Sequence, residues 1–250
     1  MQLDGRAAVI TGGGSGIGRA TCIALARAGA NVIVADISEA GGAETIDLIG
    51  PNAGKAIFRR CDVTRTEDVA AAFASAVEHF GRFDIAHNNA GIAGEDLFVD
   101  DTSSWQRMVA INLTAVIDGT RVAVREMQRG RGGVIINTAS MGGLLPMPDA
   151  PVYAATKAGV VNFTRSLAYL AGQSNIRVNA ICPTFTDTPL VRRDNSNERI
   201  EELKLQVGGI LLPEDIAAGV VELIEDDSRA GAIMRVTVRG GRDYVRDIRA

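Results

Sequence analysis

Tyr153 and Lys157 stand four residues apart in the run Tyr153-Ala-Ala-Thr-Lys157. Residues at this spacing share one face of a helix, so a phenol and an ammonium would be neighbours there. A unit charge ~4 Å away at an effective dielectric of ~20 contributes roughly 4 kcal/mol, or about three pKa units before desolvation opposes it, to a tyrosine whose usual pKa is near 10. A phenol shifted in this way could exchange protons near neutral pH, which predicts an acid/base pair. The competing interpretation is an ordinary amphipathic pair, because this spacing also arises by chance.

The segment 11–18, Thr-Gly-Gly-Gly-Ser-Gly-Ile-Gly, follows an apolar run and opens a segment of helical period. Glycines at such a turn let the backbone approach a pyrophosphate, whose charge is stabilised by the helix N-terminus. The residues expected to contact the nucleotide are Gly12, Ser15, Gly16, Ile17 and Gly18 of this segment, and Ile37 farther along the chain. The alternative is a tight strand–helix turn that binds no ligand.

Asp36 ends the next apolar run, eighteen residues after Gly18, where a carboxylate would meet the two hydroxyls of an adenosine ribose. A carboxylate accepts hydrogen bonds from these hydroxyls and repels a 2′-phosphate. No Lys or Arg occupies positions 13–15 or Ile37 to neutralise such a phosphate. The sequence therefore predicts NAD as the cofactor in preference to NADP. A simple helix N-cap is the competing role for Asp36.

The elements that would position these residues alternate between short apolar runs and segments of helical period. Continuous β-branched runs indicate strands buried on both faces of a parallel sheet. We predict strands at 7–11, 31–36, 56–58 leading into 61–63, 83–87, 133–138, 176–182 and 232–238. We predict helices at 16–28, 39–49, 66–80, 103–127, 151–171 and 213–224. This alternation predicts one α/β domain over residues 1–250, a Rossmann-type doubly wound fold whose seven-stranded parallel sheet carries helices on both faces.

One segment, 184–212, does not fit this alternation, because it is long and is charged in its middle. A loop of this length inside a compact domain is usually a lid or a binding loop. We expect it to close over the substrate, with a static pair of surface helices as the alternative.

Composition excludes several classes of protein. Hydrophobic residues make up 46% and charged residues 22% of the 250 positions, as in ordinary globular chains. The net charge of −4 provides no electrostatic attraction for nucleic acid or an anionic membrane. No apolar run reaches the roughly 18 residues that span a bilayer, and the N-terminal residues do not resemble a signal peptide, so we expect a cytoplasmic protein. Three scattered cysteines and two histidines predict neither disulfides nor a metal site.

Several motifs occur in a fixed order along the chain: the glycine segment 11–18, Asn88-Asn89-Ala90-Gly91, Asn112, Ser140 and Tyr153-x-x-x-Lys157. Together they resemble the short-chain dehydrogenase/reductases, in their compact single-domain branch, over essentially the whole chain. The resemblance implies that Tyr153 exchanges a proton with the alcohol or carbonyl oxygen, and that Lys157 lowers the pKa of Tyr153 and binds the nicotinamide ribose. It also implies that Ser140 polarises the substrate oxygen and that Asn112 supports a water through which the proton leaves. Without the other motifs, Ser140 would be a strand-end turn residue and Asn112 a helix residue that satisfies buried backbone.

The same resemblance implies further contacts to the cofactor. Asp62 would accept from the adenine amino group, Val63 would donate through its backbone, and Asn89 and Gly91 would line the adenosine side. The family's Pro-Gly-x-x-x-Thr segment, which holds the nicotinamide carboxamide, corresponds to residues 183–188, with Thr184 in place of the glycine. The members of that segment expected at the cofactor are Pro183, Phe185, Thr186 and Thr188.

The C-terminal half is similar to the NAD-dependent hydroxyprostaglandin dehydrogenases, in Pro151-Val152-Tyr153 and in Asn179-Ala-Ile-Cys-Pro183, among other segments. That subgroup places a Gln three residues before its Tyr, where this chain has Ala150. Besides Ser140 and Tyr153, the residues expected to line an apolar substrate pocket are Leu144, Met147, Ala150, Phe185 and Leu190, although each could also be packing.

The function predicted from the sequence is an NAD-dependent oxidoreductase acting on a secondary alcohol or ketone. A nucleotide-binding sensor or scaffold without catalysis is the first alternative, and a carbonyl reductase acting in the reductive direction is the second. The long helices 103–127 and 151–171 carry more apolar residues than one sheet face needs, so we expect a homodimer or homotetramer. The apolar residues in question are Val116, Val122, Val124, Val160, Phe163, Leu167 and Leu170.

Overall fold

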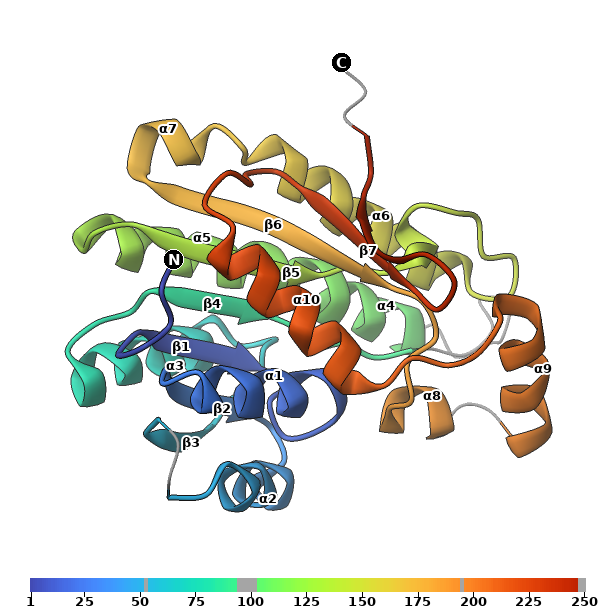
Figure 1. Ribbon diagram of the computed structural model, residues 1–250, viewed down its shortest axis with the longest axis horizontal. Helices are drawn as coiled ribbons and strands as arrows, with labels where there is room; N and C mark the ends of the chain where they lie inside the picture. Colours follow the sequence, from blue (N-terminus) through green and yellow to red (C-terminus); the bar gives the residue numbers. More distant parts are fainter. Residues whose placement is uncertain (52–53, 94–102, 194–195, 247–250) are drawn as a thin grey trace.

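The computed structural model describes residues 1–51, 54–93, 103–193 and 196–246. Its centre is one sheet in which the strands lie in the order β3-β2-β1-β4-β5-β6-β7-β8. The strands are β1 (Ala7–Thr11), β2 (Asn31–Asp36), β3 (Ala56–Arg60), β4 (Ile85–Asn88), β5 (Gly133–Thr138), β6 (Ile176–Pro183), β7 (Ile233–Thr237) and β8 (Gly241–Tyr244). The first seven are parallel, so the doubly wound fold is confirmed (Figure 1).

The prediction of seven strands is wrong by one, because β8 pairs antiparallel with β7 at the edge of the sheet. Its four residues, Gly-Arg-Asp-Tyr, are exposed or half-buried and contain no apolar run. An edge strand buries little surface and so leaves no hydrophobic pattern in the sequence. The turn before it uses Gly241 at a φ of 63°, in the left-handed region that favours glycine.

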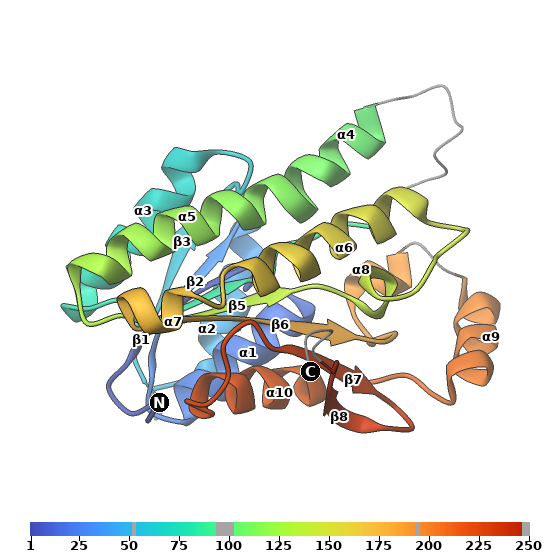
Figure 2. The ribbon, with the colours of Figure 1, turned by 90° about the horizontal axis from the view of Figure 1, so that it is seen from above.

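Helices cover both faces of the sheet (Figure 2). On one face, α1 (Gly16–Arg27), α2 (Glu39–Ile49) and α10 (Pro213–Glu225) pack on a core that includes Leu25, Ile49 and Leu223. On the other face, α3 (Thr66–Phe80), α5 (Ala115–Arg129) and α6 (Pro151–Ser166) lie over the sheet, where Phe73 and Met127 are fully buried. No helix among the described residues is both long and apolar enough to span a bilayer.

The two long helices differ from the prediction. The first consists of α4 (Ser103–Val109), a π-helical turn (Ala110–Thr114) and α5, and the second ends at Ser166 before the short α7 (Leu170–Ser174). Between α6 and α7 the backbone makes i to i+3 bonds, including Leu167 N to Thr164 O at 3.1 Å. A π turn inside a helix is often found at a functional site, and this one carries Asn112.

The segment 184–212 contains two helices instead of a loop, α8 (Pro189–Arg193) and α9 (Asn197–Val207). Residues 194–195 within this segment lie outside the described residues. Ser196 caps α9 by accepting a hydrogen bond from the Arg199 amide at 3.2 Å, and Gly208 ends it with a φ of 87°. These are ordinary helix start and stop signals, so they were available in the sequence.

Asp84 joins the amino ends of the strands on the side opposite the glycine segment. Its carboxylate accepts from the Ala7 amide at 2.9 Å, from Arg82 at 2.5 and 2.7 Å, and from Arg6 at 3.2 Å. The side chain is almost fully buried, and burial alone would raise its pKa. The hydrogen bonds from Arg82, Ala7 and Arg6 outweigh burial and hold the pKa of Asp84 below its usual value.

Candidate active site

The glycine segment forms a tight loop between β1 and α1. Gly12 and Gly16 have φ angles of 67° and 49°, which favour glycine. A Cβ at Gly18 would lie 2.0 Å from the Gly12 carbonyl oxygen, so the loop closes on itself too tightly for any side chain there. Ser15 is the N-cap of α1, and its side chain makes no capping hydrogen bond. The helix N-terminus with its glycine backbone therefore fits the pyrophosphate of a dinucleotide.

Asp36 lies against this loop. Its Oδ2 accepts from the Gly14 amide and its Oδ1 from the Ser38 amide, each at 2.8 Å. Ser38, not Asp36, is the N-cap of α2, because its hydroxyl accepts from the Gly41 amide at 3.1 Å. The carboxylate is half-buried beside Ile37, whose side chain is exposed. Asp36 is thus held in a fixed orientation at the end of β2.

Two arginines, Arg19 and Arg60, lie near Asp36. No pattern in the sequence predicts this placement. Arg19, on α1, donates to the Gly14 carbonyl and to Glu44 Oε2, each at 2.6 Å. Arg60 stands opposite Asp36 in the register of β3 and β2 and is exposed. Because Arg19 is paired with Glu44, its charge is already balanced within the protein.

The residues expected on the adenosine side are Asp62, Val63, Asn89 and Gly91. Asp62 Oδ1 accepts from the Thr64 hydroxyl at 2.7 Å and the Thr64 amide at 3.0 Å, and these bonds hold the pKa of Asp62 below its usual value. Asn89 Nδ2 donates to the Thr11 carbonyl at 3.0 Å, which ties β4 to the glycine loop. A Cβ at Gly91 would lie 3.3 Å from Asn112 Oδ1 and 3.6 Å from Lys157 Nζ, so Gly91 is beside the expected catalytic residues.

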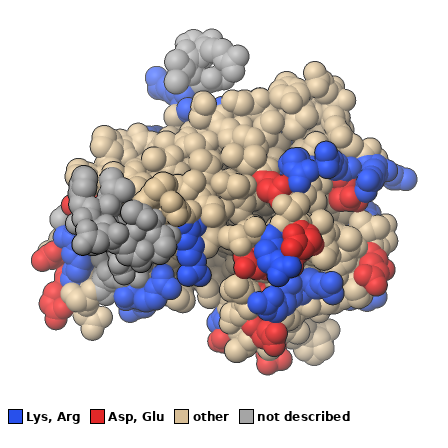
Figure 3. All heavy atoms as spheres, turned by 180° about the vertical axis from the view of Figure 1, so that it is seen from behind, with Lys and Arg blue, Asp and Glu red and all other residues tan. Residues whose placement is uncertain are grey.

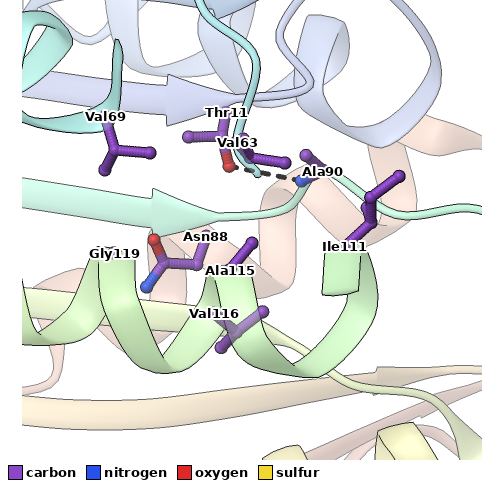
Figure 4. Close-up of a pocket in the computed structure, with 9 residues that line it drawn as sticks. All are labelled: Thr11, Val63, Val69, Asn88, Ala90, Ile111, Ala115, Val116 and Gly119. Carbon is purple, nitrogen blue, oxygen red and sulfur yellow. Dashed lines mark hydrogen bonds between the residues drawn. The ribbon is translucent and has the colours of Figure 1, made fainter. Parts of the chain in front are cut away.

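Behind Val63 lies a small cavity of about 10 Å³ between α5 and the ends of β1 and β4 (Figure 4). Its lining consists of Thr11, Val63, Val69, Asn88, Ala90, Ile111, Ala115, Val116 and Gly119. This volume is about that of one water. The cavity therefore cannot hold a substrate.

Tyr153 and Lys157 lie on α6, as the spacing predicts. Lys157 is only 3% exposed, its Nζ donates to the Thr138 carbonyl at 2.8 Å, and Nζ lies 5.8 Å from the centroid of the Tyr153 ring. Burial lowers the pKa of Lys157 to about 8. Burial also raises the pKa of Tyr153, against the opposing effect of a hydrogen bond from Ser140.

The lowering of the Tyr153 pKa expected from a nearby ammonium does not prevail in this structure, because the opposing effect of burial is larger. That prediction assumed an ammonium ~4 Å from the phenol and left open how far desolvation opposes it. In the fold, Lys157 directs its ammonium at the Thr138 carbonyl, and desolvation of both side chains dominates. The sequence could not show how deeply the pair is buried.

Ser140 follows β5 and faces Tyr153. Its Oγ accepts from the Gly142 amide at 3.1 Å, which caps the 3₁₀ turn Met141–Gly143. The hydroxyl proton is then free to be donated to Tyr153 or to a substrate oxygen. Ser140 thus has the strand-end turn role considered from the sequence and is also beside the phenol.

Asn112 is fully buried on the π turn. Its side chain makes two bonds to the backbone of Ile92, accepting from the amide and donating to the carbonyl, each at 2.8 Å. Asn112 therefore satisfies buried backbone, which was the competing interpretation from the sequence.

The segment 183–188 runs from the end of β6 toward the glycine loop. A Cβ at Gly16 would lie 3.1 Å from Thr188 Cγ2, so Thr188 is in contact with that loop. Thr186 forms an isolated parallel bridge with Leu211, and its hydroxyl donates to the Thr184 carbonyl at 3.0 Å. Thr184 itself donates through its amide to the Val236 carbonyl at 3.0 Å and has no positive φ, so replacing glycine there causes no strain.

The residues expected to line the substrate pocket differ in the side chains that they contact. Met147 packs against Gly142, where an added Cβ would lie 2.2 Å from Met147 Sδ and 3.6 Å from Ser140 Oγ. Leu144 packs against the core formed by residues such as Val116 and Val160, so its role includes packing. Ala150, Phe185 and Leu190 are half-buried on the segments leading into α6 and α8.

Three further residues, Thr138, His87 and Arg19, belong to the site, although no sequence pattern predicts them. Thr138 and His87 lie beneath Lys157 and Asn89, and Arg19 binds the glycine loop to α2. Each is a polar residue near a strand end or in the first turn of a helix, but no spacing rule connects them. Among the described residues, no group of three or more His, Cys, Asp or Glu is arranged to hold a metal ion.

Comparison with known proteins gives consistent results. The family profile "short chain dehydrogenase" matches residues 6–199. The 15-hydroxyprostaglandin dehydrogenase (NAD(+)) of Mus musculus is 37% identical over 98% of this chain and 95% of that protein. The cyclohexanol dehydrogenase of Acinetobacter sp. (strain SE19) is 35% identical over 91% of this chain and 90% of that protein. The solved 3-ketoacyl-(acyl-carrier-protein) reductase of Brucella melitensis, complexed with NADH, superposes with a TM-score of 0.85 at 30% identity, covering 94% of this chain and 98% of that one.

Proposed function

Because the chain belongs to the short-chain dehydrogenase family, we propose that it transfers hydride between a secondary alcohol, or the corresponding ketone, and the nicotinamide of NAD. The observation that carries this proposal is the buried Lys157 beside Tyr153 and Ser140, at the same edge of the sheet as the glycine loop and Asp36. The names of the relatives, an NAD(+)-dependent hydroxyprostaglandin dehydrogenase and a cyclohexanol dehydrogenase, support the same substrate class.

The residues of the loop would hold the cofactor. The amides at the start of α1 bind the pyrophosphate, and Asp36 accepts from the adenosine ribose. Asp62, Val63 and Asn89 would line the adenosine side, Gly91 lies beside the catalytic residues, and residues 183–188 would line the nicotinamide side. When bound, NAD supplies the carbon that accepts the hydride.

The protein's own side chains manage the proton. In oxidation, Tyr153 takes the proton from the substrate hydroxyl, and Ser140 donates a hydrogen bond to the same oxygen. Lys157, held by the Thr138 carbonyl, would place a positive charge near Tyr153, and this charge would oppose the effect of burial on the phenol. Asn112 holds the backbone of Ile92 beside this group and supports the path by which the proton reaches solvent.

Tyr153→Phe tests the proposal. The substitution removes the proton-transferring oxygen and little else, so we expect turnover to fall roughly 10²–10⁴-fold, while NAD binding, measured by fluorescence titration, changes little. Tyr169→Phe, the same change at an exposed tyrosine between α6 and α7, is the matched control. Retention of more than about a tenth of the wild-type rate would contradict the role of Tyr153.

Two alternatives predict different results in a screen of secondary alcohols and ketones. A nucleotide-binding sensor or scaffold would show no turnover with any of them, although such a protein has no chemical need for Ser140, Tyr153, Lys157 and Asn112 together. A carbonyl reductase would favour ketones with NADH, and levodione reductase is among the solved structures that this chain resembles, with a TM-score of 0.87 at 30% identity. We favour oxidation because the curated relatives compared above are named as dehydrogenases.

We propose a homodimer or homotetramer, on grounds that differ from the sequence argument. Val116, Val122, Val160 and Leu170 are buried within one chain, so they do not form a second apolar stripe. The large apolar residues left exposed on the same layer include Val77, Trp105, Ile117 and Tyr169. The face covered by α5 and α6 also shows a broad area without charged side chains (Figure 3).

We propose that residues 184–212 act as a lid over the site and that the rest of the chain forms one domain. Arg192 pairs with Asp187 inside this segment, and Arg199 on α9 lies 3.6 Å from Asp149, which precedes α6. The pair between Arg199 and Asp149, which joins α9 to the residues before α6, is exposed and therefore adds little resistance to opening.

We also propose a cytoplasmic location. Cys22, Cys61 and Cys182 are all free and buried, which suits a compartment where thiols stay reduced.

A further inference from the structure

A buried chain of hydrogen bonds runs from His87, on β4, to the candidate active site. His87 Nε2 lies 2.8 Å from Thr138 Oγ1, and Thr138 Oγ1 lies 3.2 Å from Asn89 Oδ1. The carbonyl of the same Thr138 accepts from Lys157 Nζ at 2.8 Å. Thr138 is therefore a branch point, with its hydroxyl bonded to Asn89 and His87 and its carbonyl bonded to Lys157.

The directions of these bonds follow from the partners. Asn89 Nδ2 faces two carbonyl oxygens, those of Thr11 at 3.0 Å and Gly12 at 3.5 Å, and carbonyls can only accept. The oxygen of the Asn89 amide must then face Thr138, whose hydroxyl donates its single proton to it. Toward His87 the Thr138 oxygen can only accept, so His87 Nε2 must carry a hydrogen.

The other ring nitrogen of His87 carries none. The side chain is 0% exposed, and Nδ1 has no hydrogen-bond partner among the described residues. A charged ring would bury an unpaired N–H at this position, at a large cost. Burial accordingly lowers the pKa of His87 to about 3.

We infer that His87 is a positioning residue for the reaction: as a neutral ring with its hydrogen on Nε2, it fixes the Thr138 hydroxyl, and through Thr138 the amide of Asn89 and the carbonyl that binds Lys157. This inference rests on the role of Lys157 in the proposed function. One imidazole thereby orients two parts of the site, the glycine loop through Asn89 and the ammonium through Thr138. Without the donor at His87, the Thr138 hydroxyl loses one of its two bonds and can leave Asn89.

The state of the ring can be measured directly in the wild-type protein by NMR of histidine labelled with ¹⁵N in the ring. The chain has only two histidines, and the other, His79, is exposed on α3, so His79→Gln assigns the signals. We expect Nε2 of His87 to be protonated and Nδ1 to be bare, with no titration of this ring between pH 8 and pH 5. A hydrogen on Nδ1, or a doubly protonated ring at pH 7, would overturn the inference.

Two substitutions then test the consequence for catalysis. His87→Leu removes the donor, whereas His87→Gln can place an amide N–H near the position of Nε2. We expect His87→Leu to lower kcat and to raise KM for NAD, with a combined loss in kcat/KM of about tenfold to a hundredfold. His87→Gln should recover most of that loss even if both variants unfold at a lower temperature than the wild type.

Thr21→Val is the matched control, because Thr21 Oγ1 is the other buried side-chain atom without a partner in the described part of the chain. This variant also changes a buried polar residue, and it should leave kcat and KM for NAD unchanged. Equal losses in His87→Leu and His87→Gln would show a merely structural role and overturn the inference. A failure of the proposed function is distinct, since it would appear as an active Tyr153→Phe while the NMR result for His87 stands.

Discussion

Asp36→Asn should weaken the preference for NAD over NADP by removing one negative charge with almost no change in shape. A unit charge ~6 Å from a 2′-phosphate, at an effective dielectric of ~20, contributes about 3 kcal/mol of repulsion per phosphate charge. That energy corresponds to about a hundredfold in relative kcat/KM. The asparagine can still accept from one of the two amides, those of Gly14 and Ser38, that Asp36 now binds at 2.8 Å.

Asp36→Ala should shift the ratio further. It frees both amides, which then become hydrogen-bond donors available to a phosphate, and it removes the acceptor for the ribose hydroxyls. We therefore expect kcat/KM for NAD to fall and kcat/KM for NADP to rise. The exposed Arg60, opposite Asp36 in the sheet, would add to the gain with NADP at low salt.

The assay is kcat/KM for both cofactors at two salt concentrations, followed by absorbance of the reduced nicotinamide. Asp47→Asn is the control, because it makes the same charge change at an exposed position on α2, the helix that follows Asp36. A change in the NADP/NAD ratio of less than about threefold in Asp36→Asn, or one no larger than in Asp47→Asn, would refute the electrostatic argument. A wild-type enzyme that prefers NADP would refute the assignment of Asp36 itself.

Three further predictions concern stability, the lid and assembly. The lowered pKa of Asp84 contributes stability that is present above the ordinary carboxyl pKa of about 4 and is lost as pH falls through the folded-state value. In urea unfolding curves, Asp84→Asn should therefore lower the free energy of unfolding by about 2–4 kcal/mol at pH 7 and by progressively less below pH 4. A loss that does not depend on pH would contradict this account. Tryptic cleavage at Arg199 and Lys204 on α9 should slow when NAD and a substrate analogue are bound, whereas equal cleavage in both states would indicate a static helix pair. Light scattering at micromolar concentration should give a mass of two or four chains, and a mass near the 26.3 kDa of one chain would exclude the proposed oligomer.

The sequence predicts the inner strands well because each is an apolar run buried on both faces, as at β1 and β5, where every residue is buried. The sequence does not predict β8, which is polar and lies at the edge of the sheet. It also does not predict α9, because the charge of this segment indicates a loop despite the cap signals at Ser196 and Gly208. Both errors arise where an element buries little surface. Hydrophobic pattern alone cannot mark such elements.

In the candidate site, too, relations between residues of one helix can be predicted from the sequence, whereas contacts between distant segments cannot. Tyr153 and Lys157 were found because their relation is a spacing within one helix. His87 and Thr138 are 51 positions apart and meet only when β4 and β5 pair, so no local pattern connects them. The net direction of the Tyr153 pKa shift could not be predicted for a related reason, because it depends on burial by segments far away in the chain.

The charged strands at the two edges of the sheet affect whether this protein aggregates at high concentration. β3 ends in the exposed pair Arg59 and Arg60, and β8 carries the exposed Arg242. A strand from a second chain that paired in register with either edge would bring like charges together or strip water from them, which is how natural sheets avoid open-ended aggregation. Copies of this chain should therefore meet through their helices, and fibre-like growth along the sheet should be suppressed even when the protein is concentrated.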